Sequence, residues 1–289
     1  MICLTGDVHH QSCHTREASL IAPRTEIQLA REYVEIAQAY GLKVTLFTTG
    51  RTFEEEWEDA QDLIGYKNLE IGGHTYNAFT PLWLHRGFKL IRGSYWGPSF
   101  LQRREIRQTM GVIHARTGIS IVSWRNHSLE YDRNTPRLLG DCGIRVWSNI
   151  LDRRCTYPYW ISDHLLALPI NVTSDHSAVY HGFVTKEWVE QNRAKWITGL
   201  KRLLQSTRAP EPEYYSREKW MARVQQEVRD KVELGGLAVL NLHPVCMYLL
   251  DQFRTFEILC AFFARFPSIW AKDALELART QYKGSHLGL

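Results

Sequence analysis

The sequence lacks several features that would assign it to a specialised class of protein. Its six cysteines include no Cys-x-x-Cys pair, which argues against a zinc knuckle or a dithiol redox motif. No apolar run approaches the ~20 residues that a membrane-spanning helix needs. No basic start is followed by the short apolar segment of a signal peptide. We therefore expect a soluble, reduced, cytoplasmic protein with no membrane partner.

A strong excess of either charge is also absent. The formal net charge is +4 at pH 7, and lysine and arginine are scattered rather than gathered in a run. This mild balance gives no indication of a nucleic-acid partner. There is no internal repeat and no low-complexity segment. A chain of 289 residues with 44% hydrophobic residues can bury a large core, and we predict a single domain spanning residues 1–289.

Helical and strand patterns alternate along the chain. Thr25 and Gln28 have the spacing of a capping box at the start of the first helix. The alternation of strands and helices implies a parallel sheet or barrel. Residues 79–100 show no regular period and are predicted to form a long loop. The predicted strands are 2–5, 43–48, 68–71, 119–124, 144–147, 165–172 and 237–242, and the predicted helices are 25–40, 52–64, 102–117, 134–140, 186–205, 216–233 and 252–266.

Charged groups and imidazoles follow five of these strands. Reacting groups in barrels and open parallel sheets stand at the C-terminal ends of strands. A carboxylate and an imidazole placed there suit a metal ligand or a general base. The alternative is a set of solvated turns with incidental histidines. The residues concerned are Asp7, His9, His10, His74, Arg125, His127, Asp175, His176 and His243.

The motifs at these strand ends resemble those of NodB-type polysaccharide deacetylases, carbohydrate esterase family four. Residues 6–9 read Gly-Asp-Val-His, 74–78 read His-Thr-Tyr-Asn-Ala, 124–127 read Trp-Arg-Asn-His and 240–244 read Leu-Asn-Leu-His-Pro. These match the first, second, third and fifth motifs of the family in order. The resemblance covers residues 1 to about 274, and it implies an α/β fold, a distorted barrel of about seven parallel strands.

The resemblance also implies roles for four residues. Asp7 takes the place of the general base, and His243 takes the place of the general acid. Arg125 would orient Asp7 and keep it ionised, because an adjacent cation lowers the pKa of a carboxylate. Asp175 falls where the fourth motif should be and would orient His243.

The implied cofactor is a divalent metal ion, with zinc the expected one. His9 stands where the family has a metal-binding aspartate, and His74 is the first histidine of the second motif. Ala78 replaces the second histidine and cannot bind a metal. His9 and His74 could therefore bind a metal with another ligand, or could merely hydrogen-bond one another or nearby loops with no metal present. His10 is the predicted third ligand, and the candidates to complete the shell are His10, Asn77 and Asp7.

The function implied is hydrolytic removal of an N-acyl group, with acetyl expected, from an amino sugar or a saccharide precursor. One alternative is an amidase that acts on a carbon–nitrogen bond outside sugars. Another is a barrel that binds a saccharide without catalysis, which the loss of the ligand at Ala78 favours. Trp83, Trp96 and Trp160 are candidates for stacking on sugar rings, although core packing is the commoner role of tryptophan. The sequence gives no indication of the oligomeric state.

Overall fold

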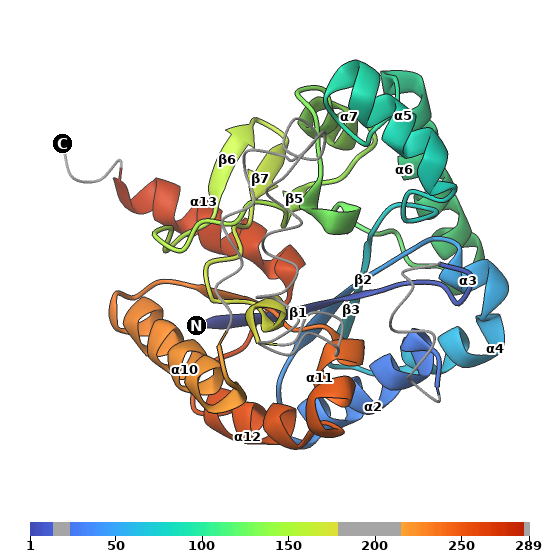
Figure 1. The fold of residues 1–289 in the computed structure, drawn as a ribbon. Coiled ribbons are helices and arrows are strands. Elements are labelled where there is room, and N and C mark those ends of the chain that lie inside the picture. The colour runs from blue at the N-terminus through green and yellow to red at the C-terminus, as the bar shows by residue number, and fades with distance from the viewer. Residues whose placement is uncertain (14–23, 179–214, 286–289) are drawn as a thin grey trace, which may run out of the picture.

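The computed structural model of the chain describes residues 1–13, 24–178 and 215–285 (Figure 1). Within them, eight strands form one sheet in the order β6-β7-β5-β4-β3-β2-β1-β8. Seven strands run parallel, and only the edge strand β6 is antiparallel to its neighbour. The sheet curls into a half-barrel, which confirms the predicted α/β fold. The strands are β1 (Ile2–Val8), β2 (Val44–Thr48), β3 (Leu69–Gly73), β4 (Ser123–Trp124), β5 (Val146–Trp147), β6 (Tyr159–Ser162), β7 (Leu165–Ala167) and β8 (Ala238–Asn241).

Helices cover the outside of the curled sheet, as Figure 1 shows. The predicted capping box is present at the first of them: Thr25 Oγ1 accepts from the backbone N–H of Gln28, and the Gln28 side chain accepts from that of Thr25. The α-helices are α2 (Glu26–Ala39), α3 (Thr52–Glu55), α4 (Trp57–Ala60), α5 (Leu82–Arg92), α6 (Ser99–Thr117), α7 (Thr135–Asp141), α10 (Arg217–Glu233), α11 (Pro244–Asp251), α12 (Arg254–Phe263) and α13 (Ala274–Ser285), and the 3-10 helices are η1 (Gln61–Gly65), η2 (His127–Leu129), η3 (Asp175–Ser177) and η4 (Ala271–Asp273).

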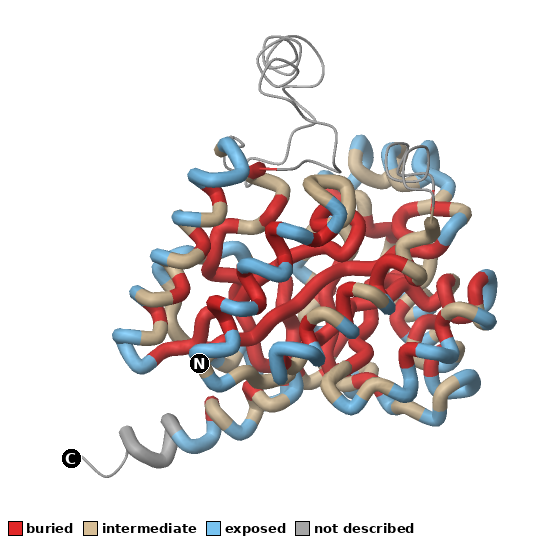
Figure 2. Tube along the Cα trace, turned by 90° about the horizontal axis from the view of Figure 1, so that it is seen from below, coloured by how far each residue is buried: buried red, intermediate tan, exposed pale blue. Residues whose placement is uncertain are grey.

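Strand β1 is buried along its whole length, because β2 and β8 pair with its two edges (Figure 2). Side chains alternate between the two faces of a strand. Ile2 and Leu4 join the larger apolar core, whereas Cys3 belongs to a second cluster on the opposite face. Asp7 lies on the same face as Cys3, four residues further along. The sequence of β1 thus directs a carboxylate toward the inside of the curl.

The open side of the half-barrel is bridged by the segment that follows β7. The backbone N–H of Asn171 donates to the Val239 carbonyl at 3.3 Å, and Asn171 Oδ1 accepts from the backbone N–H of Val239 at 2.8 Å. These bonds tie the chain after β7 to the outer edge of β8. As a result, η3 with Asp175 comes to lie beside the end of β8.

Several predicted elements need correction. Residues 82–92 form α5 inside the predicted loop, and this helix buries none of its residues. The predicted helix 252–266 is shorter, because Gln252 and Phe253 have φ of 55° and 68° and separate α11 from α12. Helix 52–64 is broken at Glu56, and strands 119–124 and 165–172 shrink to the short β4 and β7. Helix α13 was not predicted, and the predicted helix 186–205 lies outside the described residues.

The cysteines agree with the sequence analysis. None of the six, all of which lie in the described residues, forms a disulfide, and Cys3 and Cys260 are buried. Burial raises the pKa of both thiols, which keeps them protonated. Among the helices of the described residues, none combines the length and apolar character required to span a membrane.

Candidate active site

A buried arginine organises the inner end of the site. Arg125 follows β4 and is fully buried. Its Nη1 donates to Asp7 Oδ1 at 2.8 Å and to Asn241 Oδ1 at 2.6 Å. Its Nη2 donates to Thr5 Oγ1 at 2.7 Å and to Ser148 Oγ at 2.8 Å, and its Nε donates to the Ser148 carbonyl at 2.8 Å. Every N–H of the guanidinium therefore has an acceptor, which fixes the position of Asp7.

Asp7 is a carboxylate despite its burial. Burial alone would raise the pKa of Asp7, but the adjacent Arg125 guanidinium outweighs it. The nearby rings of His74 and His243 lower the pKa further, and the result lies well below the ordinary value. An ionised carboxylate in this position can accept a proton.

His243 lies between two carboxylates. Its Nδ1 is 2.9 Å from Asp175 Oδ1, and its Nε2 is 3.3 Å from Asp7 Oδ2. Burial would lower the pKa of His243, but Asp175 and Asp7 together raise it to about 10. The ring of His176 stacks on it, with centroids 4.3 Å apart. His243 is therefore an imidazolium at neutral pH and can donate a proton from Nε2.

Three imidazoles form a cluster next to this acid–base pair. His9, His74 and His127 each offer one ring nitrogen, and the three atoms lie within 4.8 Å of one another. His9 Nε2 is 3.0 Å from His127 Nδ1. His74 Nδ1 is buried and has no hydrogen-bond partner in the described part of the chain. Burial lowers the pKa of His74 to about 3, so its ring is neutral.

Glycine at the end of β3 brings two of these histidines together. A Cβ on Gly73 would lie 2.3 Å from the ring of Trp124, so a larger residue would push β3 away from β4. The backbone N–H of Arg125 donates to the Gly73 carbonyl at 2.9 Å. The residues that follow the two strands, His74 and His127, therefore lie side by side.

Glu26 orients the remaining ring of the cluster. Its Oε2 is 2.9 Å from His9 Nδ1 and accepts from the His9 backbone N–H at 2.9 Å. Burial would lower the pKa of His9, but Glu26 raises it above the ordinary value. A carboxylate bonded to one imidazole nitrogen is the usual support of a metal-binding histidine, because it leaves the other nitrogen facing the site.

The donor set fits a divalent metal ion. Three imidazoles converge, and the buried Nδ1 of His74 has no other partner among the described residues. Three histidine ligands with a remaining position for water is a known arrangement of catalytic zinc. His9 and His74 are not hydrogen-bonded to one another in the described residues, and their rings make an edge contact at 5.0 Å between centroids. His9 does bond to its surroundings, at Glu26 and His127, whereas Nδ1 of His74 has no such partner there.

The predicted third ligand, His10, is not part of this cluster. Its Nδ1 lies 3.1 Å from Thr49 Oγ1, because consecutive side chains after a strand point in opposite directions. Asn77 is also engaged elsewhere: its Oδ1 accepts from Arg51 at 2.9 Å. Asp7 is held by Arg125 and His243.

His127 takes the position that the sequence analysis gave to His10. The two-residue spacing that links Asp7 with His9 at the end of β1 also links Arg125 with His127 after β4. That signal could have identified His127 before the fold was known. The other predicted site residues, Asp7, Arg125, Asp175 and His243, are brought together.

Comparison with known proteins agrees with this geometry. Residues 27–147 match the family model described as polysaccharide deacetylase. A protein assigned as a polysaccharide deacetylase from Mycobacterium smegmatis is 17% identical, with a TM-score of 0.68 over 97% of this chain and 90% of that chain. One from Pseudomonas aeruginosa PAO1 is 14% identical, with a TM-score of 0.62 over 98% and 91%. The allantoinase PuuE is 12% identical, with a TM-score of 0.62 over 96% and 89%. No curated protein matches the chain.

The family match covers residues 27–147, less than half of the chain, and it supports a deacetylase-like hydrolase of carbon–nitrogen (amide) bonds. Over these residues the chain is similar to the polysaccharide deacetylase family, consistent with a divergent, NodB-type member. This confirms the resemblance drawn from the sequence motifs. The structural likenesses, at such low identity, show the shared fold.

Proposed function

We propose that the chain is a metal-dependent hydrolase that removes an N-acyl group, with acetyl expected, from an amino sugar or a saccharide precursor. The observation that carries the proposal is the contact between a carboxylate, Asp7, and an imidazolium, His243, at 3.3 Å. Amide hydrolysis needs a proton acceptor for the attacking water and a proton donor for the leaving amine. Asp7 is ionised and His243 is protonated at neutral pH, which are the protonation states that these two roles require.

The metal ion would be held by His9, His74 and His127, with zinc the expected ion. When bound, such an ion polarises the acyl oxygen and lowers the pKa of water. The support for this set is the convergence of three ring nitrogens within 4.8 Å and the carboxylate of Glu26 behind His9.

The residues of the chain would share the proton transfers. Asp7 would accept the proton of the attacking water while Arg125 holds its other oxygen. His243 would donate its Nε2 proton to the amine nitrogen as the carbon–nitrogen bond breaks, because an amide anion is a poor leaving group. Asp175 would hold the His243 ring through Nδ1. The proton gained by Asp7 can then return to His243 across their contact, which restores both groups.

A free-amine assay with N-acetylated glucosamine oligomers tests the proposal. Zinc-loaded wild-type protein should release free amine and acetate in equal amounts, and Asp7→Asn should release far less. His114→Ala is the matched control, since His114 is exposed on α6 away from the cluster. Release from simple amides but not from N-acetyl sugars would favour an amidase outside sugars. Saturable binding of the oligomers without any release would favour a saccharide-binding barrel.

A further inference from the structure

Helix α5 turns its apolar side chains toward solvent. Trp83, Leu90 and Ile91 are 73%, 68% and 82% exposed, and no residue of the helix is buried. These three side chains lie on one side of the helix at 100° per residue. Isolated exposed apolar residues are ordinary, but a cluster of large ones marks a surface that binds something.

Two polar side chains of α5, His85 and Lys89, face the protein instead, whereas Arg86 and Arg92 are exposed. His85 Nδ1 is 2.9 Å from the Tyr95 carbonyl, and Lys89 Nζ is 3.3 Å from a carboxylate oxygen of Glu130. The side chain of Lys89 is only 9% exposed. The helix is thus attached through polar contacts, and its orientation is the reverse of that of an ordinary surface helix.

Positive charge is concentrated around this helix. Residues 82–107 contain six basic side chains and one acidic side chain, a net charge of +5, whereas the whole chain carries +4. The rest of the protein is therefore close to neutral. The acidic member, Glu105, accepts a hydrogen bond from the backbone N–H of Tyr76 at 3.1 Å and does not pair with the arginines in the described residues.

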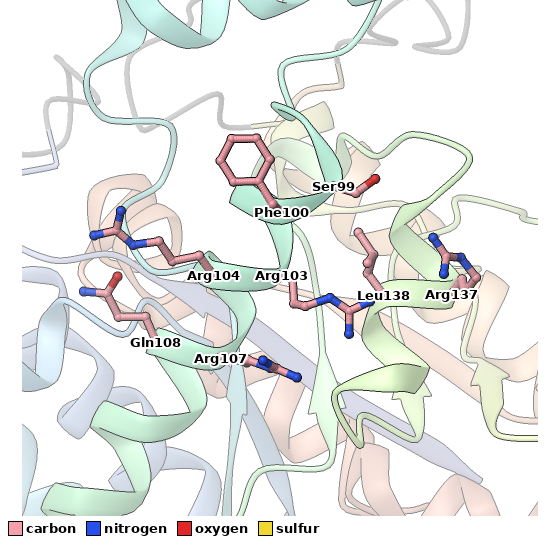
Figure 3. A pocket seen from close by; sticks show the side chains of 8 residues that line it. All are labelled: Ser99, Phe100, Arg103, Arg104, Arg107, Gln108, Arg137 and Leu138. Atoms are coloured by element: carbon pink, nitrogen blue, oxygen red, sulfur yellow. The ribbon is translucent and has the colours of Figure 1, made fainter.

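A basic hollow of about 690 Å³ lies between α6 and α7, near α5 (Figure 3). Phe100, 69% exposed, extends from the start of α6 beside it. Arg103 and Arg137 both contact Asp141, at 2.9 and 3.7 Å. Arg104 and Arg107 are exposed and form no ion pair within the described part of the chain. The hollow is lined by Ser99, Phe100, Arg103, Arg104, Arg107, Gln108, Arg137 and Leu138.

We propose that α5 and the arginines of α6 bind the surface of an anionic lipid bilayer. A helix with tryptophan, leucine and isoleucine on one face and basic residues around it is suited to lie in the plane of a membrane interface. Anionic headgroups attract each nearby basic side chain. The proposal replaces the expectation of no membrane partner, which rested on the lack of a spanning segment; an interfacial helix requires none.

A second copy of the chain fits this surface less well. A two-fold symmetric dimer would bring the same patch of both subunits together. Each patch carries the exposed arginines Arg86, Arg92, Arg104 and Arg107, so the apolar contact would be opposed by like-charge repulsion. The interface of an anionic bilayer offers an apolar region for the exposed face of α5 and negative headgroups for the arginines.

Helix α5 borders the histidine cluster through its protein-facing side. The ring of Phe79 contacts His85 of α5 at 5.0 Å between centroids and His127 at 5.3 Å. Bilayer binding would therefore hold the cluster near the membrane surface. Neither observation depends on the proposed hydrolytic function.

Vesicle flotation tests the proposal directly. The full chain is mixed with vesicles of equal parts phosphatidylglycerol and phosphatidylcholine, or of phosphatidylcholine alone. We expect flotation with the anionic vesicles, little with the neutral ones, and a decline as salt is raised. Ile91→Glu should weaken binding by about tenfold or more, because burial of an isoleucine side chain contributes at least that factor. Arg104→Gln with Arg107→Gln should weaken binding to anionic vesicles only.

Leu234→Glu is the matched control. Leu234 is 66% exposed and directly follows α10, so this variant should leave flotation unchanged. Circular dichroism checks that each variant is folded. Failure of the wild-type chain to float with anionic vesicles would overturn the proposal, and so would unchanged flotation of Ile91→Glu. Sedimentation showing a dimer that Ile91→Glu dissociates, without vesicle binding, would assign the surface to a second copy.

Discussion

The Nε2 atom of His243, which follows β8, lies 3.3 Å from Oδ2 of Asp7, which lies near the end of the neighbouring strand β1. Residues 236 positions apart in the chain thus meet because the last strand of the sheet pairs with the first. Arg125 holds the far side of Asp7, and Asp175 holds the far side of His243. The protonation states of the pair follow from these two outer partners.

Asp7→Asn should lower turnover on an N-acetyl sugar by about 10²–10⁴-fold, the usual contribution of a positioned base. The fold should be retained, because an amide oxygen can still accept from Arg125. Turnover and the circular dichroism spectrum would be measured together. Wild-type turnover in this variant would remove Asp7 from the reaction.

Asp175→Asn should shift the alkaline limb of the pH–rate profile toward lower pH. His243 must be protonated to act, so activity is present below its pKa of about 10 and is lost as pH rises through that value. Without the charge of Asp175, burial lowers the pKa of His243. The contribution of protonated His243 to the free energy of unfolding is likewise fully present below pH 6.5, the ordinary pKa of histidine. It is lost as the pH rises toward 10. Asp163→Asn, at an exposed position, is the control, and an unmoved limb in Asp175→Asn would contradict this role.

The three-histidine cluster predicts which variants lose metal. Wild-type protein dialysed against zinc should retain close to one ion per chain, measured by plasma mass spectrometry. His74→Ala and His127→Ala should both lose it, because two imidazoles hold zinc weakly. His10→Ala should retain it. If His127→Ala kept the metal and His10→Ala lost it, the third ligand would be His10 as the sequence first indicated.

Glu26→Gln should weaken zinc binding by about 10–100-fold, the usual effect of removing a carboxylate behind a histidine ligand. The His9 ring would remain, but its orientation and basicity would no longer be fixed by a charge. Competition with a zinc-binding dye gives the dissociation constant without reference to activity. Unchanged affinity in Glu26→Gln would mean that His9 is not a ligand.

Arg125→Met should reduce the free energy of unfolding by roughly 3–5 kcal/mol, because it leaves the buried Asp7 carboxylate without its cation. The hydroxyl of Thr5 and the amide of Asn241 also lose a donor. Urea unfolding measures the change. Arg107→Met, at an exposed position, should change stability by less than about 0.5 kcal/mol. Equal stability of the two variants would show that the Arg125 network contributes little.

Much of the fold and of the acid–base pair could be predicted from the sequence. Polar residues stand at or near the ends of buried strands, as Asp7 does next to the last residue of β1 and His243 does after β8, and parallel strands gather those residues at one rim. Arg125 and Asp175 were predicted from their positions relative to the family motifs. In the structure Arg125 contacts Asp7, and Asp175 contacts His243. Such signals depend on residues close together in the sequence, so they can be recognised before the packing is known.

The third imidazole and α5 could not be predicted in the same way. His127 enters the cluster only because Gly73 lets β3 approach β4, a contact between distant segments. Helix α5 has a helical period, but that period places the apolar side chains on an exposed face, and the prolines and glycines around it led to the prediction of a loop. His10 was predicted as the third ligand because it is next to His9 in the sequence. The direction in which each side chain points after the strand decides which of them meet, and His10 points away from His9.

The central claim is that water, deprotonated at Asp7 beside the histidine cluster, attacks the acyl carbon of an N-acylated amino sugar. The most direct measurement is hydrolysis of N-acetylated glucosamine oligomers in water labelled with heavy oxygen, with mass spectrometry of the released acetate. The account predicts one labelled oxygen in each acetate released by the zinc-loaded wild type, and almost no release by Asp7→Asn. Acetate that carries no label, or equal release by the two proteins, would contradict it.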